Sequence, residues 1–148
     1  MWTWKRVFGK VLSYWKKVSS LFNTKNTKNT DLGKLGEDLA ANFLKRKGFK
    51  ILTKNWIYGK GEIDLVALEK CHNILVFVEV KLRSSNASTS GYFAVDGKKK
   101  NILRKTCKAY LRKFGSTNTC YRFDVVAIKI NQAENSHMIL HYENVKLF

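Results

Sequence analysis

The sequence predicts an α/β domain in which helices flank a β-sheet, preceded by a separate basic helix. Apolar residues recur every three or four positions in two segments of the domain, and they alternate or run together in five shorter ones. These segments follow the order helix, three strands, helix, strand, with a short last strand near the C-terminus. A chain of 148 residues with 45% hydrophobic content is long enough for one domain with its own core.

The N-terminal segment is basic and amphipathic. Apolar residues from Trp4 to Phe22 recur at helical spacing with lysines between them, which predicts a helix over residues 1–22. Its charges interrupt any long apolar run, so it is predicted neither to span a membrane nor to be a signal peptide. Two interpretations stay open: an anchor at a membrane surface or an arm on nucleic acid, and a helix packed on the domain or a partner. The polar repeat over 23–30 predicts a linker, and the domain covers 31–148.

The net charge indicates which class of partner the protein binds, and the cysteine content indicates in which cellular compartment it is found. The chain has 28 Lys and Arg against 11 Asp and Glu, a formal charge of +17, which predicts a polyanionic partner such as nucleic acid or an anionic membrane surface. The three cysteines are far apart and form no CxxC pair, so neither a disulfide framework nor a structural zinc site is indicated. We therefore expect a cytoplasmic protein.

The two helices of the domain are recognised by their periodicity and their ends. The first begins at Leu32 and ends at Gly48, a typical C-terminal stop. The second is capped by Asp96, carries a stripe of Leu103, Cys107, Tyr110 and Phe114, and ends at Gly115.

The strands are bounded by turn residues. Glycines at 59 and 61 separate the first two strands, a polar segment follows the second, and a Ser-rich loop over 84–91 follows the third. The predicted strands are 49–57, 62–68, 74–83, 121–130 and 138–142.

The second and third strands bring acidic residues together. If they form a hairpin centred on Cys71 and His72, opposed residues share an index sum of 143, so Asp64 faces Glu79 and Glu62 faces Lys81 on one side of the sheet. The other side is apolar and predicts core, with these pairs: Ile63 with Val80, Leu65 with Val78, and Ala67 with Val76.

Carboxylates that face each other disfavour folding unless something compensates their charge. A divalent cation such as Mg²⁺ does so, because it takes one or two carboxylates and keeps positions open for water and phosphate. Lys81 points the same way as Glu79 and can assist an attacking water or meet charge on a phosphate. Glu37 shares a helix stripe with small and apolar residues and can reach the same site. The alternative is structural: a Glu62–Lys81 salt bridge, with Asp64 and Glu79 at an exposed strand end.

Ordered motifs across residues 32–130 resemble the YraN-like family of bacterial proteins, UPF0102. That family is similar to the PD-(D/E)XK nuclease superfamily and to archaeal Holliday-junction resolvases. The resemblance implies a restriction-endonuclease-like core in the order α-β-β-β-α-β, with a mixed central sheet flanked by helices. The motifs are Leu35-Gly36-Glu37, Asn55-Trp56, Gly61-Glu62-Ile63-Asp64-Leu65, Val76-Phe77-Val78-Glu79-Val80-Lys81, Ala94-Val95 with a lysine near Lys99, and Arg122-Phe123-Asp124-Val125.

The resemblance also implies roles for single residues. Asp64 and Glu79 correspond to the two metal-binding acids, Lys81 to the catalytic lysine, and Glu37 to the acid on the first helix, while the backbone carbonyl of Val80 adds a further metal ligand. The implied function is a Mg²⁺- or Mn²⁺-dependent endonuclease that hydrolyses DNA, including branched or damaged DNA. Leu82 departs from the family's usual small polar residue, and three consecutive lysines, 98 to 100, blur which of them matches the family's lysine.

Basic residues outside the acidic centre are candidates for phosphate contacts. One stripe of the second helix is basic, and Arg83 follows the acidic centre along its strand; the alternative is that these residues form an ordinary solvated face. The candidate contacts are Arg83, Lys98, Lys99, Lys105, Lys108 and Arg112. A noncatalytic nucleic-acid-binding protein on the same fold, held at the inner face of the membrane by residues 1–22, remains the competing function, and the state as a monomer or homodimer stays open.

Overall fold

The computed structural model describes residues 29–84, 97–116, 119–131, 134 and 136–147. The predicted N-terminal helix over 1–22 and most of the predicted linker lie outside these residues. The predicted Ser-rich loop and the cap at Asp96 also lie outside them, apart from Ser84. The predicted linker is two residues too long, because Asn29 and Thr30 already belong to the first helix of the domain.

The domain has the predicted α/β architecture. The five strands form one sheet in the order β1-β2-β3-β4-β5, and all neighbours pair antiparallel except β3 and β4. That parallel pair requires a crossover connection, which contains α3. The mixed sheet, the order α-β-β-β-α-β and the predicted short last strand, which is β5, are therefore confirmed. The elements are α2 (Asn29–Arg46), β1 (Phe49–Tyr58), β2 (Gly61–Glu69), β3 (Ile74–Ser84), α3 (Gly97–Phe114), β4 (Tyr121–Asn131) and β5 (Ser136–Tyr142).

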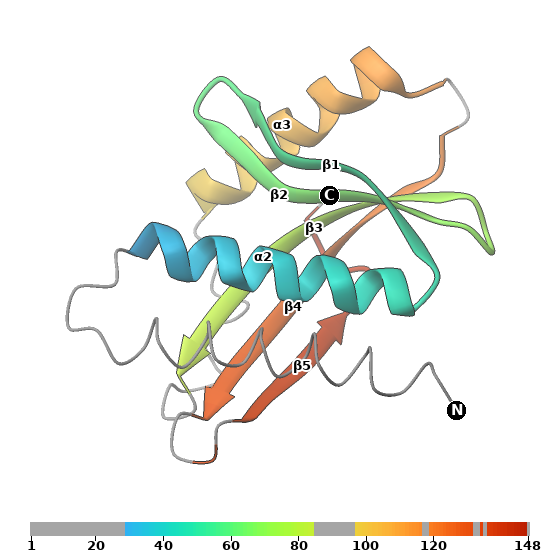
Figure 1. Cartoon of the computed structure of the whole chain (residues 1–148). Coiled ribbons are helices and arrows are strands. Elements are labelled where there is room, and N and C mark those ends of the chain that lie inside the picture. Colours follow the sequence, from blue (N-terminus) through green and yellow to red (C-terminus); the bar gives the residue numbers. More distant parts are fainter. Residues whose placement is uncertain (1–28, 85–96, 117–118, 132–133, 135, 148) are drawn as a thin grey trace.

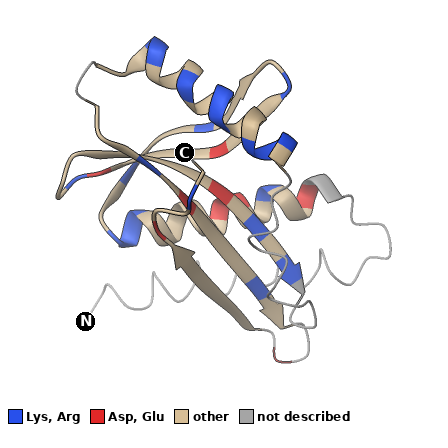
Figure 2. Cartoon of the chain, turned by 180° about the vertical axis from the view of Figure 1, so that it is seen from behind, with Lys and Arg blue, Asp and Glu red and all other residues tan. Residues whose placement is uncertain are grey.

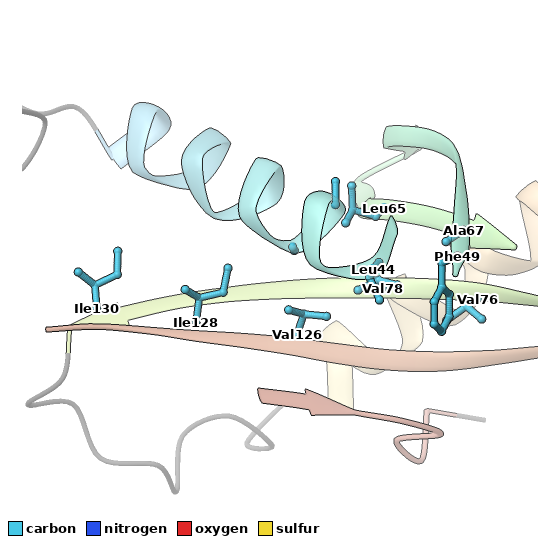
Figure 3. Close-up of a cluster of buried hydrophobic side chains, with 11 residues drawn as sticks. Leu44, Phe49, Leu65, Ala67, Val76, Val78, Val126, Ile128 and Ile130 are labelled. Atoms are coloured by element: carbon cyan, nitrogen blue, oxygen red, sulfur yellow. The ribbon is translucent and has the colours of Figure 1, made fainter. Parts of the chain in front are cut away.

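The two helices pack on opposite faces of the sheet (Figure 1). Small residues at Ala40 and Ala41 bring α2 close to the strands, and Figure 3 shows the resulting cluster between α2 and the sheet. The other face packs against Leu103, Cys107 and Tyr110 of α3, while Phe114, predicted to share that stripe, is 57% exposed. Neither described helix is long and apolar enough to cross a membrane. The α2 cluster consists of Ala40, Ala41, Leu44, Phe49, Leu65, Ala67, Val76, Val78, Val126, Ile128 and Ile130.

The pairing of β2 with β3 follows the predicted register and then stops. Five residue pairs, from Glu69 with Ile74 to Leu65 with Val78, share the predicted index sum. The next pair, Asp64 with Glu79, does not form. Instead, Oδ2 of Asp64 accepts a hydrogen bond from the backbone N–H of Val80 at 2.6 Å, which a continued ladder would direct to the backbone of β2. The predicted cross-strand pairs at and beyond Asp64 are therefore wrong. The sheet splits at this point, and only β3 continues beside β4.

Beyond the split, the β1–β2 hairpin belongs to the α3 side of the molecule. Ile63, predicted on the same face as Leu65, instead packs in the cluster formed with α3. A Cβ on Gly61 would lie 2.0 Å from Oγ1 of Thr106, so glycine is required where the hairpin meets α3. On the other face, a Cβ on Gly36 would lie 3.3 Å from Cβ of Leu82, so glycine also permits the close approach of α2 to β3.

A buried polar cluster ties β4 to the C-terminal segment on the α2 side. Asp124 is fully buried and accepts hydrogen bonds from Nε of Arg122 at 3.0 Å and from the backbone N–H of Asn144 at 2.9 Å. Nε2 of His141 lies 2.8 Å from its other oxygen. Burial alone would raise the pKa of Asp124, but the contacts with His141 and Arg122 outweigh burial and hold that pKa below its ordinary value of 3.8.

Replacement of Asp124 by alanine is expected to lower the free energy of unfolding by about 3 kcal/mol at pH 7, because the buried guanidinium of Arg122 loses its most buried partner. Urea unfolding measures the change. Because the folded pKa lies below the ordinary value, the contribution is present above about pH 4 and disappears as the pH falls further. The control is Asp38→Ala, which breaks an exposed ion pair with Lys54 and costs about 0–1 kcal/mol. Equal losses in the two variants would contradict this assignment.

Candidate functional site

The split in the sheet places two carboxylates beside each other. Asp64 and Glu79 each lie one residue beyond Leu65 and Val78, the last residues that pair between β2 and β3. Burial, followed by the nearby charge of Glu79, raises the pKa of Asp64 from its ordinary value of 3.8 to about 7. The hydrogen bond from Val80 opposes this rise without cancelling it. Asp64 is therefore an acid whose ionised form the described residues compensate poorly.

Glu79 has the opposite electrostatic environment, although its side chain is buried and that of Asp64 only half-buried. Its Oε1 accepts hydrogen bonds from Nζ of Lys81 at 2.5 Å and from Nζ of Lys99 at 2.9 Å. Burial would raise the pKa of Glu79, but the bonds and charges of the two lysines prevail and lower it. Lys81 follows Glu79 on β3, whereas Lys99 comes from the first turns of α3. Glu79 is thus held ionised by lysines from two elements.

The third acid, Glu37, comes from α2, which packs on the face of the sheet opposite to α3. Its charge is among the causes that raise the pKa of Asp64, so the two carboxylates interact. Oε2 of Glu37 accepts a hydrogen bond from Nδ2 of Asn55 at 3.0 Å. The four residues predicted to converge are therefore linked. The charges of Glu37, Glu79 and Lys81 all act on the pKa of Asp64, and Lys81 also donates a hydrogen bond to Glu79.

The donor set suits a hard cation that keeps part of its water shell. In the part of the chain that the structure describes, no three His, Cys, Asp or Glu side chains are grouped closely enough to hold a metal ion unaided. Asp64 and Glu79 nevertheless offer the one or two carboxylates that Mg²⁺ ordinarily takes from a protein, with the remaining positions filled by water and phosphate. The carboxylate of Asp64, whose charge is poorly compensated, is suited to binding a cation. At Glu79, a cation would have to compete with Lys81 and Lys99 for the carboxylate.

The predicted phosphate contacts fall into three places. The helix stripe of Lys98, Lys105, Lys108 and Arg112 is exposed, opposite the buried side of α3, and Figure 2 shows basic segments recurring along this helix. Arg83 is exposed on β3 and pairs in register with Lys129 of β4. Lys99 does not belong to the exposed stripe, because its Nζ bonds Glu79 within the acidic site.

Three features of the site differ from the sequence predictions or were left unresolved by them. Glu62 is exposed and pairs in register with Ile57 of β1, so it does not join the acids, and the Lys81 that it was predicted to face bonds Glu79 instead. Lys99 could be singled out only once the orientation of α3 was known, because three lysines follow one another there. Asn55 gave no local signal beyond its place in a motif.

Comparison with known proteins identifies similar chains. The family model described as "Uncharacterised protein family UPF0102" matches residues 36–128, more than half of the chain. A UPF0102 protein of Flavobacterium johnsoniae is 44% identical over 106 residues, which cover 70% of this chain and 85% of that protein. A UPF0102 protein of Pelotomaculum thermopropionicum is 36% identical over 113 residues, or 76% of this chain and 92% of that protein. Glu37, Asp64, Glu79 and Lys99 all lie within the matched range.

Replacement of Asp64 by asparagine is expected to stabilise the metal-free protein at pH 8 by at least about 1 kcal/mol. The folded pKa of Asp64 lies near 7 and above its ordinary value of 3.8, so ionisation costs more in the folded state. The cost is absent below about pH 4, grows as the pH rises to about 7, and is constant above it. The difference between variant and wild type in urea unfolding should follow that course.

The control is Glu62→Gln, which removes an exposed acid from the same strand and should show no such pH-dependent gain. If Asp64→Asn instead destabilised the protein at pH 8, Asp64 would be an acid required for folding.

Proposed function

The chain belongs to the UPF0102 family, and we propose that it is a divalent-metal-dependent endonuclease that hydrolyses phosphodiester bonds in DNA. The observation that carries the proposal is the pair of carboxylates at the split between β2 and β3, of which Asp64 is half-buried and Glu79 is buried. Asp64 has its pKa raised to about 7, and lysines from β3 and α3 converge on Glu79. Neighbouring titratable groups whose pKa values are shifted in opposite directions are typical of catalytic sites.

Asp64 and Glu79 would hold the cation, with the backbone carbonyl of Val80 as the third protein ligand expected from the resemblance. A bound Mg²⁺ or Mn²⁺ would supply Lewis-acid stabilisation of a phosphate and a more acidic water. Glu37 lies within electrostatic range of Asp64, so it can accept a proton or a hydrogen bond from a water at the site.

The lysines provide the positive charge that phosphate chemistry requires. Lys81 and Lys99 are both within hydrogen-bond distance of Glu79, so a phosphate brought to Glu79 meets two ammonium groups. Such groups stabilise negative charge that develops on a phosphate oxygen. The exposed basic stripe of α3 and Arg83 would bind the flanking phosphates, with an affinity that falls as the salt concentration rises.

One observation favours a second candidate, a noncatalytic nucleic-acid-binding protein on the same fold. Two lysines already neutralise Glu79, and no three-ligand cluster occurs among the described residues. In that case Lys81 and Lys99 would serve only to bind phosphate.

We also propose a cytoplasmic location, which the free thiols of Cys71, Cys107 and Cys120 support. Contact with the inner face of the membrane would involve residues 1–22, which lie outside the described part of the chain.

The full-length protein is expected to cleave at least one DNA in a panel of linear, nicked, flapped and four-way substrates with Mg²⁺ or Mn²⁺, and none in EDTA. Glu79→Gln should lower the cleavage rate at least about 100-fold, because it removes a charged ligand from the site. Glu62→Gln, on the same hairpin but outside the acidic site, should cleave at the wild-type rate. DNA binding without cleavage, equal in wild type and Glu79→Gln, would instead support the noncatalytic candidate.

A further inference from the structure

Asn55 has an unusual backbone for its position. It lies inside β1 with a φ of 50°, in the left-handed region that few residues other than glycine adopt; asparagine is one of those few, but within a strand the conformation is unusual. The other two described non-glycine residues with positive φ, Asn73 and Asn144, lie in the β2–β3 turn and after β5, outside any strand. A strand interior does not need this conformation, so some local demand maintains it.

The left-handed conformation changes the direction in which the side chain points. Successive side chains of a regular strand point to opposite faces. Here two successive residues both reach α2, since Nζ of Lys54 bonds Asp38 and Nδ2 of Asn55 bonds Glu37. Trp56 then points to the α3 side, where its Nε1 donates to the backbone oxygen of Thr106 at 3.3 Å. The unusual φ therefore brings the carboxamide of Asn55 to the acid on α2.

The register places this contact at the level of the acidic site. Lys54 pairs with Leu65, and Trp56 pairs with Ile63, so Asn55 stands across from Asp64 where the sheet splits. Asn55 thereby connects the strand beside Asp64 to the carboxylate of Glu37, which interacts electrostatically with Asp64.

The chemical nature of the donor matters as well. Glu79 is held by two ammonium groups, which neutralise its charge, whereas the Asn55 group that donates to Glu37 is a neutral amide. A neutral donor fixes a carboxylate without supplying a positive charge that would compete with a cation. An exposed hydrogen bond of this kind adds little to stability, so its net contribution to folding does not account for the strained backbone.

We propose that Asn55 is a positioning residue of the acidic site, whose carboxamide orients Glu37 toward the cation and water held beside Asp64. This inference rests on the proposed metal-dependent function. Asn55 acts through Glu37 and touches neither substrate nor cation. Partners that orient the groups of a metal site typically affect metal affinity or activity by about 10- to 100-fold when they are replaced.

The test uses the full chain with Asn55→Gly, because glycine keeps the left-handed backbone without strain and removes only the carboxamide. The expected urea midpoint without metal equals or exceeds that of the wild type. The Mn²⁺ dissociation constant from calorimetry should rise about 10-fold or more, and kcat for DNA cleavage should fall with KM unchanged. When Glu37 is already replaced by glutamine, adding Asn55→Gly should change neither the Mn²⁺ dissociation constant nor kcat any further, because the two residues act as one unit.

The matched control is Lys54→Gln, which breaks the adjacent contact between β1 and α2 and should leave the Mn²⁺ affinity unchanged. Wild-type Mn²⁺ affinity in Asn55→Gly, or an equal loss in Lys54→Gln, would overturn the role of Asn55 while the proposed function stands. An unfolded Asn55→Gly would also overturn it, by showing that the carboxamide is needed for folding. A wild-type protein that neither binds Mn²⁺ nor cleaves DNA would remove the proposed function and this inference together.

Discussion

The hydrogen bond from the backbone of Val80 to the carboxylate of Asp64 is the contact on which the site depends. It takes the place of the next pair in the β2–β3 ladder, so the sheet divides and the β1–β2 hairpin packs toward α3. The division gives Glu37 of α2 and Lys99 of α3 access to one region, although the two helices lie on opposite faces. A continuous ladder would have left these side chains separated by a sheet.

Two aspartates, Asp124 buried and Asp64 half-buried, show how the surroundings decide the role of a residue. Asp124 meets a guanidinium, an imidazole and a backbone N–H, which together lower its pKa despite burial. Desolvation of Asp64, followed by the charges of Glu79 and Glu37, raises its pKa to about 7, and the single backbone N–H that it meets does not cancel this rise. The first carboxylate is satisfied by the fold and stabilises it. The second remains in need of a proton or a cation, and this is the physical basis of the proposed metal site.

The sequence predicts the elements well because their signals are local. Alternation with a period of two located β2 and β3, and the index sum gave the five pairs that form. The same arithmetic failed at Asp64, because it assumes that a ladder continues until a strand ends and cannot foresee a side chain that replaces a strand partner. The contact of Lys99 with Glu79, in place of the predicted phosphate contact, and the role of Asn55 were not predicted, for a related reason. Their roles depend on the orientation of α3 and on a left-handed residue inside β1, and neither is encoded in local spacing.

The central claim is that Asp64 and Glu79 hold a divalent cation in competition with a proton on Asp64. Calorimetric titration of the wild-type protein with Mn²⁺ at a series of pH values between 6 and 8.5 tests this claim most directly. Because the pKa of Asp64 lies near 7, one Mn²⁺ should bind with nearly constant affinity above about pH 7.5 and weaken toward tenfold per pH unit below 7, with release of a proton to the buffer. No binding at pH 8, or an affinity that is the same at pH 6 and pH 8, would contradict it.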